Sequence, residues 1–267
     1  MRLRKGSVGL QGEGLNLRGR KSSVGGEGYN YLAETVPEGD VFAQPLLKSL
    51  EYASVQISTA RPDGGLYIWG YVPVVVAKCG LYLKDTATEV PGTFRVSGSA
   101  KRMKELQAVF DNPPKYGKNL DWKKTTYTTH DVATILRRYL TQMPEPIVPH
   151  ELYHEVRRRW SWTIKTYQNL IARMPKPNQY LLLYVLDLLS VFARKSEVNL
   201  MTAPNLAVIF QPGIISHTEH QMRPAEHTLS QAVLEFLIEH QDHFLLGMQL
   251  VSRTKLRGFV SGYKADV

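Results

Sequence analysis

Helical periodicity constrains this chain more than any other feature. Apolar residues recur at three- and four-residue intervals, first through Leu46, Leu50, Ala53 and Ile57. This spacing places them on one face of a helix, which would end near the Arg-Pro-Asp-Gly-Gly turn at 61–65. The same pattern predicts helices further along the chain: 74–84, from about 100 to 110, 130–143, 150–160, 178–194, 202–210 and 227–245. Strand-like alternation is nearly absent, so the expected fold is all-α.

The two ends of the chain differ in composition from its middle. Eight of the 20 glycines fall within residues 1–28, and residues 1–31 carry six Lys or Arg against two Glu. Such a segment cannot build a core, which predicts a flexible leader over 1–41. A second basic tail is expected over 249–267. The intervening 42–248 has the length of a single domain of about 200 residues.

Charge and cysteine content limit the classes of partner and the cellular location that we expect for this chain. The net charge of +9 favours an acidic partner, but zinc-finger spacing and interleaved aromatic and basic residues are absent, so nucleic acid is not expected. The single cysteine, Cys79, lies in an apolar run and is expected to be a buried structural thiol. The apolar stretch Leu181–Phe192 is too short to span a bilayer and contains Asp187, so it is interpreted as core. We expect a cytoplasmic protein, with recruitment to the inner face of the plasma membrane by its basic tails left open.

One segment matches a zinc-peptidase pattern. His150-Glu151-Leu152-Tyr153-His154 has the H-E-x-x-H form, which places both imidazoles on one helix face. Such a zinc site needs a third protein ligand, but Arg157 and Trp160 stand where the extended motif has glycine and histidine. The histidines of a later proline-containing loop are weaker candidates: His217, His220 and His227. We therefore expect no metal site, only a surface helix that begins after Pro149 and carries two exposed histidines.

Three other segments of the sequence are best interpreted jointly. Pro91-Gly92-Thr93-Phe94-Arg95-Val96-Ser97-Gly98-Ser99 is a short loop directly before a predicted helix, in which Phe94 can anchor while Arg95 points outward. Taken alone, Arg95 is best interpreted as a solvated arginine. A second segment, residues 130–146, contains a predicted V-A-T-I-L-R-R-Y-L helix that ends at Pro-Glu-Pro, and a third, residues 199–212, contains N-L-A-V-I-F-Q-P. Together with the loop, these segments resemble three motifs of the Rho GTPase-activating (RhoGAP) family. The resemblance covers about residues 42–246 and is closest in character to fungal members.

The resemblance implies a single helical domain of about nine helices. It also implies that Arg95 is an arginine finger, inserted into the active site of a GTP-bound Rho, Rac or Cdc-type GTPase. GTP hydrolysis builds negative charge on the leaving oxygens, and a guanidinium supplied in trans is worth about 10³–10⁵ in rate. The partner would bring Mg²⁺, GTP and the glutamine that orients water. We therefore expect this chain to need no cofactor of its own.

Other matched positions flank the finger. Arg137 stands at the family's lysine, which braces the finger loop, and Asn205 at the asparagine that contacts the finger region and the partner. Arg138 and Thr141 share the polar face of the same helix and are candidates for contact with the GTPase, although a plain solvated charge is the preferred interpretation of Arg138. Asn199 either contacts the partner or caps the following turn.

Two departures from the family pattern leave the function open. Thr141 stands where the family commonly has arginine, and Gly213 where many members have asparagine. Both bear on affinity and partner choice. Thr141, together with arginine in place of the family's lysine at Arg137, motivates the second hypothesis: a module that binds GTP-loaded GTPases without activating them. A scaffold that binds anionic membrane through the basic tails is the third.

Overall fold

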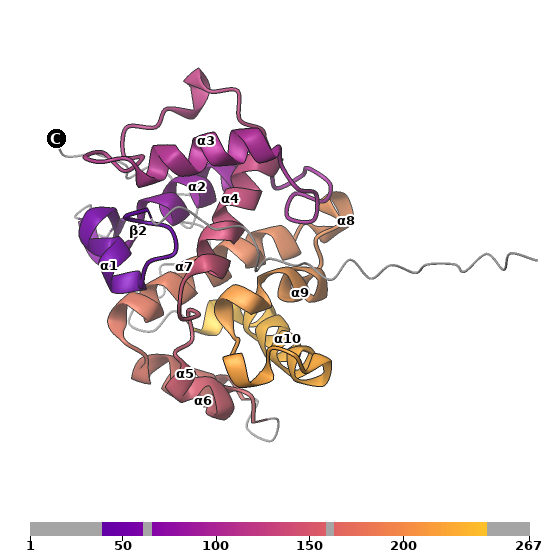
Figure 1. Ribbon diagram of the computed structural model, residues 1–267. Helices are drawn as coiled ribbons and strands as arrows, with labels where there is room; N and C mark the ends of the chain where they lie inside the picture. Colours follow the sequence, from indigo (N-terminus) through magenta and orange to yellow (C-terminus); the bar gives the residue numbers. More distant parts are fainter. Residues whose placement is uncertain (1–38, 61–65, 159–162, 245–267) are drawn as a thin grey trace, which may run out of the picture. The chain divides into compact units, whose positions relative to one another are not determined.

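The computed structural model describes residues 39–60, 66–158 and 163–244, and Figure 1 traces their course. The predicted tail 249–267 and all of the predicted leader except residues 39–41 lie outside the described residues. At the start of the described part, Val41 is already buried, and the backbone N–H groups of Val41 and Phe42 donate to the carboxylate of Asp111, each over 3.0 Å. The packed domain therefore includes residue 41.

Helices dominate the described segments, as predicted. They are α1 (Leu46–Tyr52), α2 (Val74–Thr86), α3 (Ala100–Asp111), α4 (Thr129–Gln142), α5 (His150–Val156), α6 (Ile164–Arg173), α7 (Lys176–Ala193), α8 (Ser196–Asn199), α9 (Ala203–Ile214) and α10 (Pro224–Glu239). Three short 3-10 helices join them: η1 (Trp122–Lys124), η3 (Thr218–His220) and η4 (Gln241–His243). One antiparallel pair of strands completes the set: β1 (Ser54–Ala60) and β2 (Leu66–Pro73).

Local sequence explains where the principal helices begin. Pro73 precedes the first residue of α2, and Pro175 precedes that of α7. Helix α4 begins with a capping box, in which the Thr128 hydroxyl accepts from the Asp131 backbone N–H and the Asp131 carboxylate accepts from the Thr128 N–H. Two orphan donors of the first turn are thus satisfied by side chains.

The expected helix through Leu46 and Ile57 is wrong beyond Tyr52. Helix α1 ends there, and Ile57 lies in β1, which pairs with β2. The physical reason is the β-branched residue at every second position of Val55-Gln56-Ile57-Ser58-Thr59, which favours an extended strand over a helix. The predicted turn at 61–65 lies outside the described residues.

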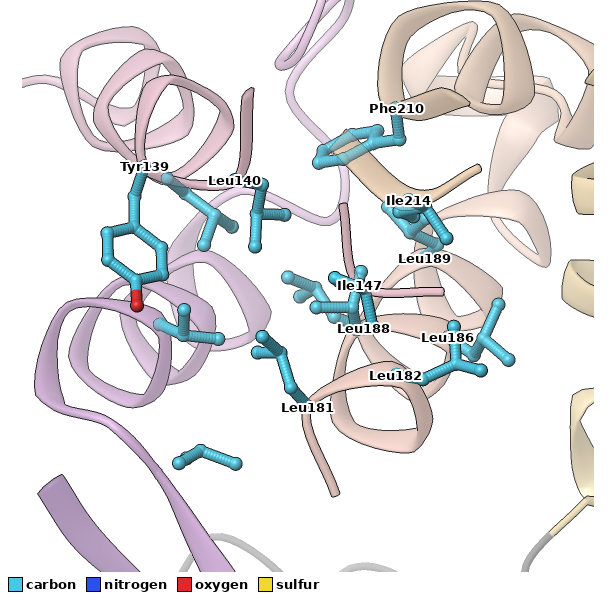
Figure 2. Packing of buried hydrophobic residues seen from close by; sticks show 14 of the residues in the cluster. Tyr139, Leu140, Ile147, Leu181, Leu182, Leu186, Leu188, Leu189, Phe210 and Ile214 are labelled. Atoms are coloured by element: carbon cyan, nitrogen blue, oxygen red, sulfur yellow. The ribbon is translucent and has the colours of Figure 1, made fainter. Parts of the chain in front are cut away.

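Helices α4 and α7 organise the core. Helix α4 packs against α2, α3 and α9, while α7 packs against α2, α9, α10 and β2. Figure 2 shows the apolar side chains where these helices meet, among them Leu140, Leu186 and Phe210. The predictions for Leu181–Phe192 as core and for Cys79 as a buried thiol are confirmed. None of the helices in the described segments is long and apolar enough to cross a bilayer.

Candidate functional site: the loop that presents Arg95

The loop between α2 and α3 makes a tight turn that exposes Arg95. Gly92 adopts φ +69°, a left-handed conformation that favours glycine. Its carbonyl oxygen accepts hydrogen bonds from the backbone N–H groups of Arg95 and Val96, both over 2.9 Å. Thr93 and Phe94 are buried, whereas Arg95 and Val96 face solvent. The turn therefore holds the Arg95 backbone in place and leaves the guanidinium outside.

Phe94 anchors this loop in the core. Its ring makes edge-on contacts with Phe192 of α7, at 4.7 Å between centroids, and with Phe210 of α9, at 5.1 Å. Beside it, the Thr93 hydroxyl donates to the carbonyl of Val90 over 2.9 Å. Burying an aromatic ring between two helices is worth a few kcal/mol, about 3–5 by truncation to alanine. The arrangement predicted for Phe94 and Arg95 is confirmed.

Helix α4 holds the loop from the other side. The Arg137 guanidinium is half-buried, and its Nη1 donates to the carbonyl oxygen of Phe94 over 3.2 Å. This carbonyl belongs to the peptide bond that leads into Arg95. One turn earlier on α4, the Thr134 hydroxyl accepts from the Gly98 N–H over 3.0 Å. Arg137 thus contacts the loop that its match to the family's lysine predicted it to brace.

Asp131 is a site residue that the sequence reasoning missed. It is fully buried, and its Oδ1 accepts from the Ser99 N–H over 2.8 Å while its Oδ2 accepts from Arg102 Nε over 2.6 Å. Burial alone would raise the pKa of this carboxyl, but hydrogen bonds from Arg102, Thr128 and Ser99 together lower it. Asp131 is therefore charged at neutral pH and ties the end of the loop to the start of α4.

Asn199 has a structural role inside the domain. Asn199 is fully buried, its amide nitrogen donating to the carbonyls of Thr88 (2.8 Å) and Phe192 (3.0 Å) and its oxygen accepting from the Met201 N–H (2.8 Å). Of the two roles predicted for Asn199, contact with a partner does not fit this burial, and capping of the following turn does.

The backbone around Asn199 links the third segment to the loop. The carbonyl oxygen of Asn199 accepts from the Gly92 N–H over 2.8 Å, so this residue also fixes the start of the Arg95 turn. Asn205 is exposed on the first turn of α9, and its amide nitrogen donates to the carbonyl of Leu200 over 3.3 Å. The hydrogen bond that holds Asn205 thus runs to the α8–α9 turn.

Arg138 and Thr141 lie beside Arg137 on α4 and are also partly exposed. Arg138 Nη1 donates to the side-chain oxygen of Gln107 in α3, over 3.3 Å. The Thr141 hydroxyl donates to the carbonyls of Arg137 (3.1 Å) and Arg138 (3.2 Å) in its own helix. The polar face predicted for α4 is present, with Arg138 turned toward α3 and Arg137 toward the loop.

Gly213 is buried, and a contact with a partner does not fit its position. A Cβ atom placed on it would lie 2.9 Å from the backbone carbonyl of Leu140, closer than such atoms pack. The glycine therefore lets α9 approach α4, and its own carbonyl accepts from the Ile147 N–H over 3.1 Å. This departure from the family pattern belongs to the core and not to the surface.

Exposed apolar side chains surround the matched segments, and the sequence reasoning did not single them out. Val96 follows Arg95, Val198 and Leu200 flank Asn199, and Val208 lies one turn beyond Asn205; about half of each is exposed (48, 56, 49 and 54%). Each lies next to a matched position in the sequence, which makes these four residues candidates for contact with a partner. Their signal was an apolar residue beside each motif position.

Comparison with known proteins identifies the domain. The RhoGAP domain family matches residues 73–219. This chain belongs to the RhoGAP family. It is 43% identical over 241 residues to Rho-GTPase-activating protein 5 of Schizosaccharomyces pombe, and 40% identical over 214 residues to Rho-GTPase-activating protein BAG7 of Saccharomyces cerevisiae. The alignments cover 88 and 76% of this chain but 66 and 51% of those relatives, so the chain spans between half and two thirds of their length.

Two solved structures share the fold. Human Rho GTPase activating protein 15 superposes with a TM-score of 0.64 at 18% identity, covering 78% of this chain and 93% of that one. The BH domain from Graf superposes with a TM-score of 0.56 at 20% identity, covering 64% of this chain and 92% of that one. The predicted helical RhoGAP fold and the resemblance to fungal members are thus confirmed.

Proposed function

We propose that this chain accelerates GTP hydrolysis by a Rho-family small GTPase, with Arg95 supplied in trans as an arginine finger. One observation carries the proposal: an exposed arginine lies on a loop of a RhoGAP domain whose backbone is held by two helices, α4 through Arg137 and Asp131, and α8 through Asn199. A solvated arginine does not need such a support. A transition-state ligand does, because its stabilising effect depends on being held in position before the reaction.

Each supporting residue would contribute to that positioning. In the complex, the Arg95 guanidinium would neutralise charge on the leaving oxygens of the γ-phosphate, while the partner supplies GTP, Mg²⁺ and the attacking water. Arg137 holds the carbonyl just before Arg95 and so limits rotation of the peptide that aims the finger. Asn205, Val96 and Val208 are exposed and would contact the GTPase surface.

The test is single-turnover hydrolysis of GTP by a panel of Rho, Rac and Cdc-type GTPases, with the chain added in small amounts. We expect Arg95→Ala to lower the accelerated rate by about 10³-fold or more while GTP-dependent binding persists. Arg95→Lys should recover little, because lysine lacks the planar fork of donors. Arg173→Ala removes an exposed arginine from α6 and serves as the matched control. Equal rates with wild type and Arg95→Ala would refute the proposal.

A module that binds GTP-loaded GTPases without activating them is the alternative. It is motivated by Thr141 at a position where the family commonly has arginine, since its hydroxyl bonds to its own helix and offers no cation. Tight GTP-dependent binding with an unchanged hydrolysis rate across the whole panel would favour it. Anionic-membrane binding through the basic ends is a further proposal, tested by salt-dependent association with phosphatidylserine vesicles.

A further inference from the structure

The histidines of α5 meet a second group of histidines from a distant part of the chain. The ring of His217 lies 4.8 Å from that of His150 and 5.6 Å from that of His154, between ring centroids, and His220 lies 5.6 Å from His154. These residues come from α5 and from the segment around η3. The H-E-x-x-H segment by itself has no third metal ligand in the nearby sequence. The fold supplies donors that sequence spacing did not reveal.

We propose that His154, His217 and Glu219 bind a transition-metal ion of the zinc class. The Glu219 Oε2 atom lies 3.6 Å from His154 Nε2 and 3.8 Å from His217 Nδ1. All three ligand atoms of the group lie within 4.8 Å of one another. Tetrahedral zinc with bonds of about 2.0–2.1 Å holds its ligand atoms about 3.3–3.4 Å apart. A small inward movement of the side chains would therefore complete the site.

The two side chains that must move to bind an ion, those of His154 and Glu219, are exposed and free to do so. His154 and Glu219 are more than half exposed, and their side chains can change rotamer at little cost, whereas the His217 side chain is mostly covered. The ring of His217 stacks on Tyr153, with 5.1 Å between centroids and 25° between planes. The site thus has one ring held against α5 and two ligands free to close on an ion.

The Nδ1 atom of His217 accepts a hydrogen bond from the Glu219 backbone N–H over 3.2 Å. A metal ion bound to Nδ1 would use the same lone pair and would therefore replace this hydrogen bond. The nearby cation, Arg157, is buried and ion-paired with Glu226, so its charge is compensated.

The donor set selects the kind of ion. Two imidazoles and one carboxylate suit zinc, and also cobalt, nickel and copper, whereas magnesium and calcium require oxygen donors. Three protein ligands leave a fourth position for water. The cluster belongs to α5 and η3, while the Arg95 loop joins α2 to α3; in Figure 1 α5 lies at the opposite end of the domain from α3. The site is therefore separate from the proposed GTPase contact, and its metal would join α5 to the η3 segment.

The test is titration of the metal-free full chain with ZnCl₂ by calorimetry, followed by the visible spectrum of the Co²⁺ form. We expect one ion per chain and absorption typical of four-coordinate Co²⁺. His217→Gln and Glu219→Gln should each weaken binding at least about tenfold, the lower end of what even outer-shell changes cost. His243→Gln, which alters an exposed histidine outside the cluster, should leave the affinity unchanged.

Two controls keep the result interpretable. Circular dichroism without metal must show that the variants fold like the wild type, and hydrogen exchange with Zn²⁺ should slow at 217–221. His150→Gln should leave binding intact, because His150 is not among the three ligands. The proposal is overturned if wild type binds no ion, if Glu219→Gln binds as well as wild type, or if His150→Gln abolishes binding while Glu219→Gln does not. GTPase assays play no part in this test, so its failure is separate from that of the Arg95 proposal.

Discussion

Replacing Asp131 by asparagine tests whether this carboxylate holds the end of the Arg95 loop. Its Oδ1 accepts from the Ser99 N–H, and its Oδ2 accepts from Arg102 Nε and from the Thr128 N–H and hydroxyl. Both oxygens face donors only, whereas asparagine has one oxygen and one NH₂ group. In either orientation of the amide, the NH₂ group therefore points at a hydrogen-bond donor.

The expected loss in the free energy of unfolding follows from these contacts. A buried donor left without an acceptor, such as the Ser99 N–H, costs about 1–3 kcal/mol. Loss of the charge at Asp131 also weakens the hydrogen bond to Arg102, because a charge-assisted bond is roughly twice as strong as a neutral one. Allowing about 1 kcal/mol for this second effect, Asp131→Asn should lower the free energy of unfolding by about 2–4 kcal/mol.

Urea unfolding followed by circular dichroism measures the loss. Asp121→Asn is the matched control, because Asp121 also caps a helix, η1, but its side chain is about half exposed, and its contact with Lys124 spans 3.7 Å. That variant should change stability by less than about 1 kcal/mol. Single-turnover GTPase assays below the unfolding range should show a smaller loss for Asp131→Asn than for Arg95→Ala. If Asp131→Asn were no less stable than Asp121→Asn, the argument that this carboxylate ties the loop to α4 would be refuted.

Two further predictions concern pH and helix packing. Because the folded pKa of Asp131 is lowered, its contribution is complete above the unfolded value of about 3.9 and is lost as the pH falls through the folded pKa. The stability difference between wild type and Asp131→Asn in urea should therefore shrink below about pH 3.9; a constant difference would contradict this. Gly213→Asn should destabilise the fold by about 1–3 kcal/mol or more, since its Cβ would meet Leu140. Thermal unfolding would show this, and Val208→Asn, at an exposed position of α9, should stay within about 0.5 kcal/mol.

Much of the helical fold was predictable because helix signals are local. Helices α2, α3, α4 and α7 lie where apolar spacing and starting residues place them, since both signals act within a few residues. The strand β1 was missed for the opposite reason. Its apolar residues fit a helical repeat as well as a strand, and the choice between them is decided by pairing with β2, which comes later in the chain. Helix α6 was missed as well, because its apolar face is short.

The site was predictable where a side chain faces outward and less so where it is buried. Arg95 and Asn205 are exposed, as their matched positions implied. Asn199 and Gly213 have internal roles that a motif cannot distinguish from contact with a partner, because burial depends on which helices pack around them. Asp131 looks in the sequence like an ordinary residue of a helix start. Only its long-range hydrogen bonds to Ser99 and Arg102 connect it to the loop.

The three matched segments meet through main-chain atoms around the loop, not through the side chain of Arg95. The Gly92 N–H bonds to the Asn199 carbonyl, the Phe94 carbonyl to Arg137, and the Ser99 N–H to Asp131. A main-chain acceptor such as the Phe94 carbonyl requires only a donor of suitable length, which lysine and arginine both provide. Arginine can therefore occupy the family's lysine position without loss of this contact. In the proposed function, the guanidinium of Arg95 would lack that tolerance, because a charged phosphoryl group would require its planar pair of donors.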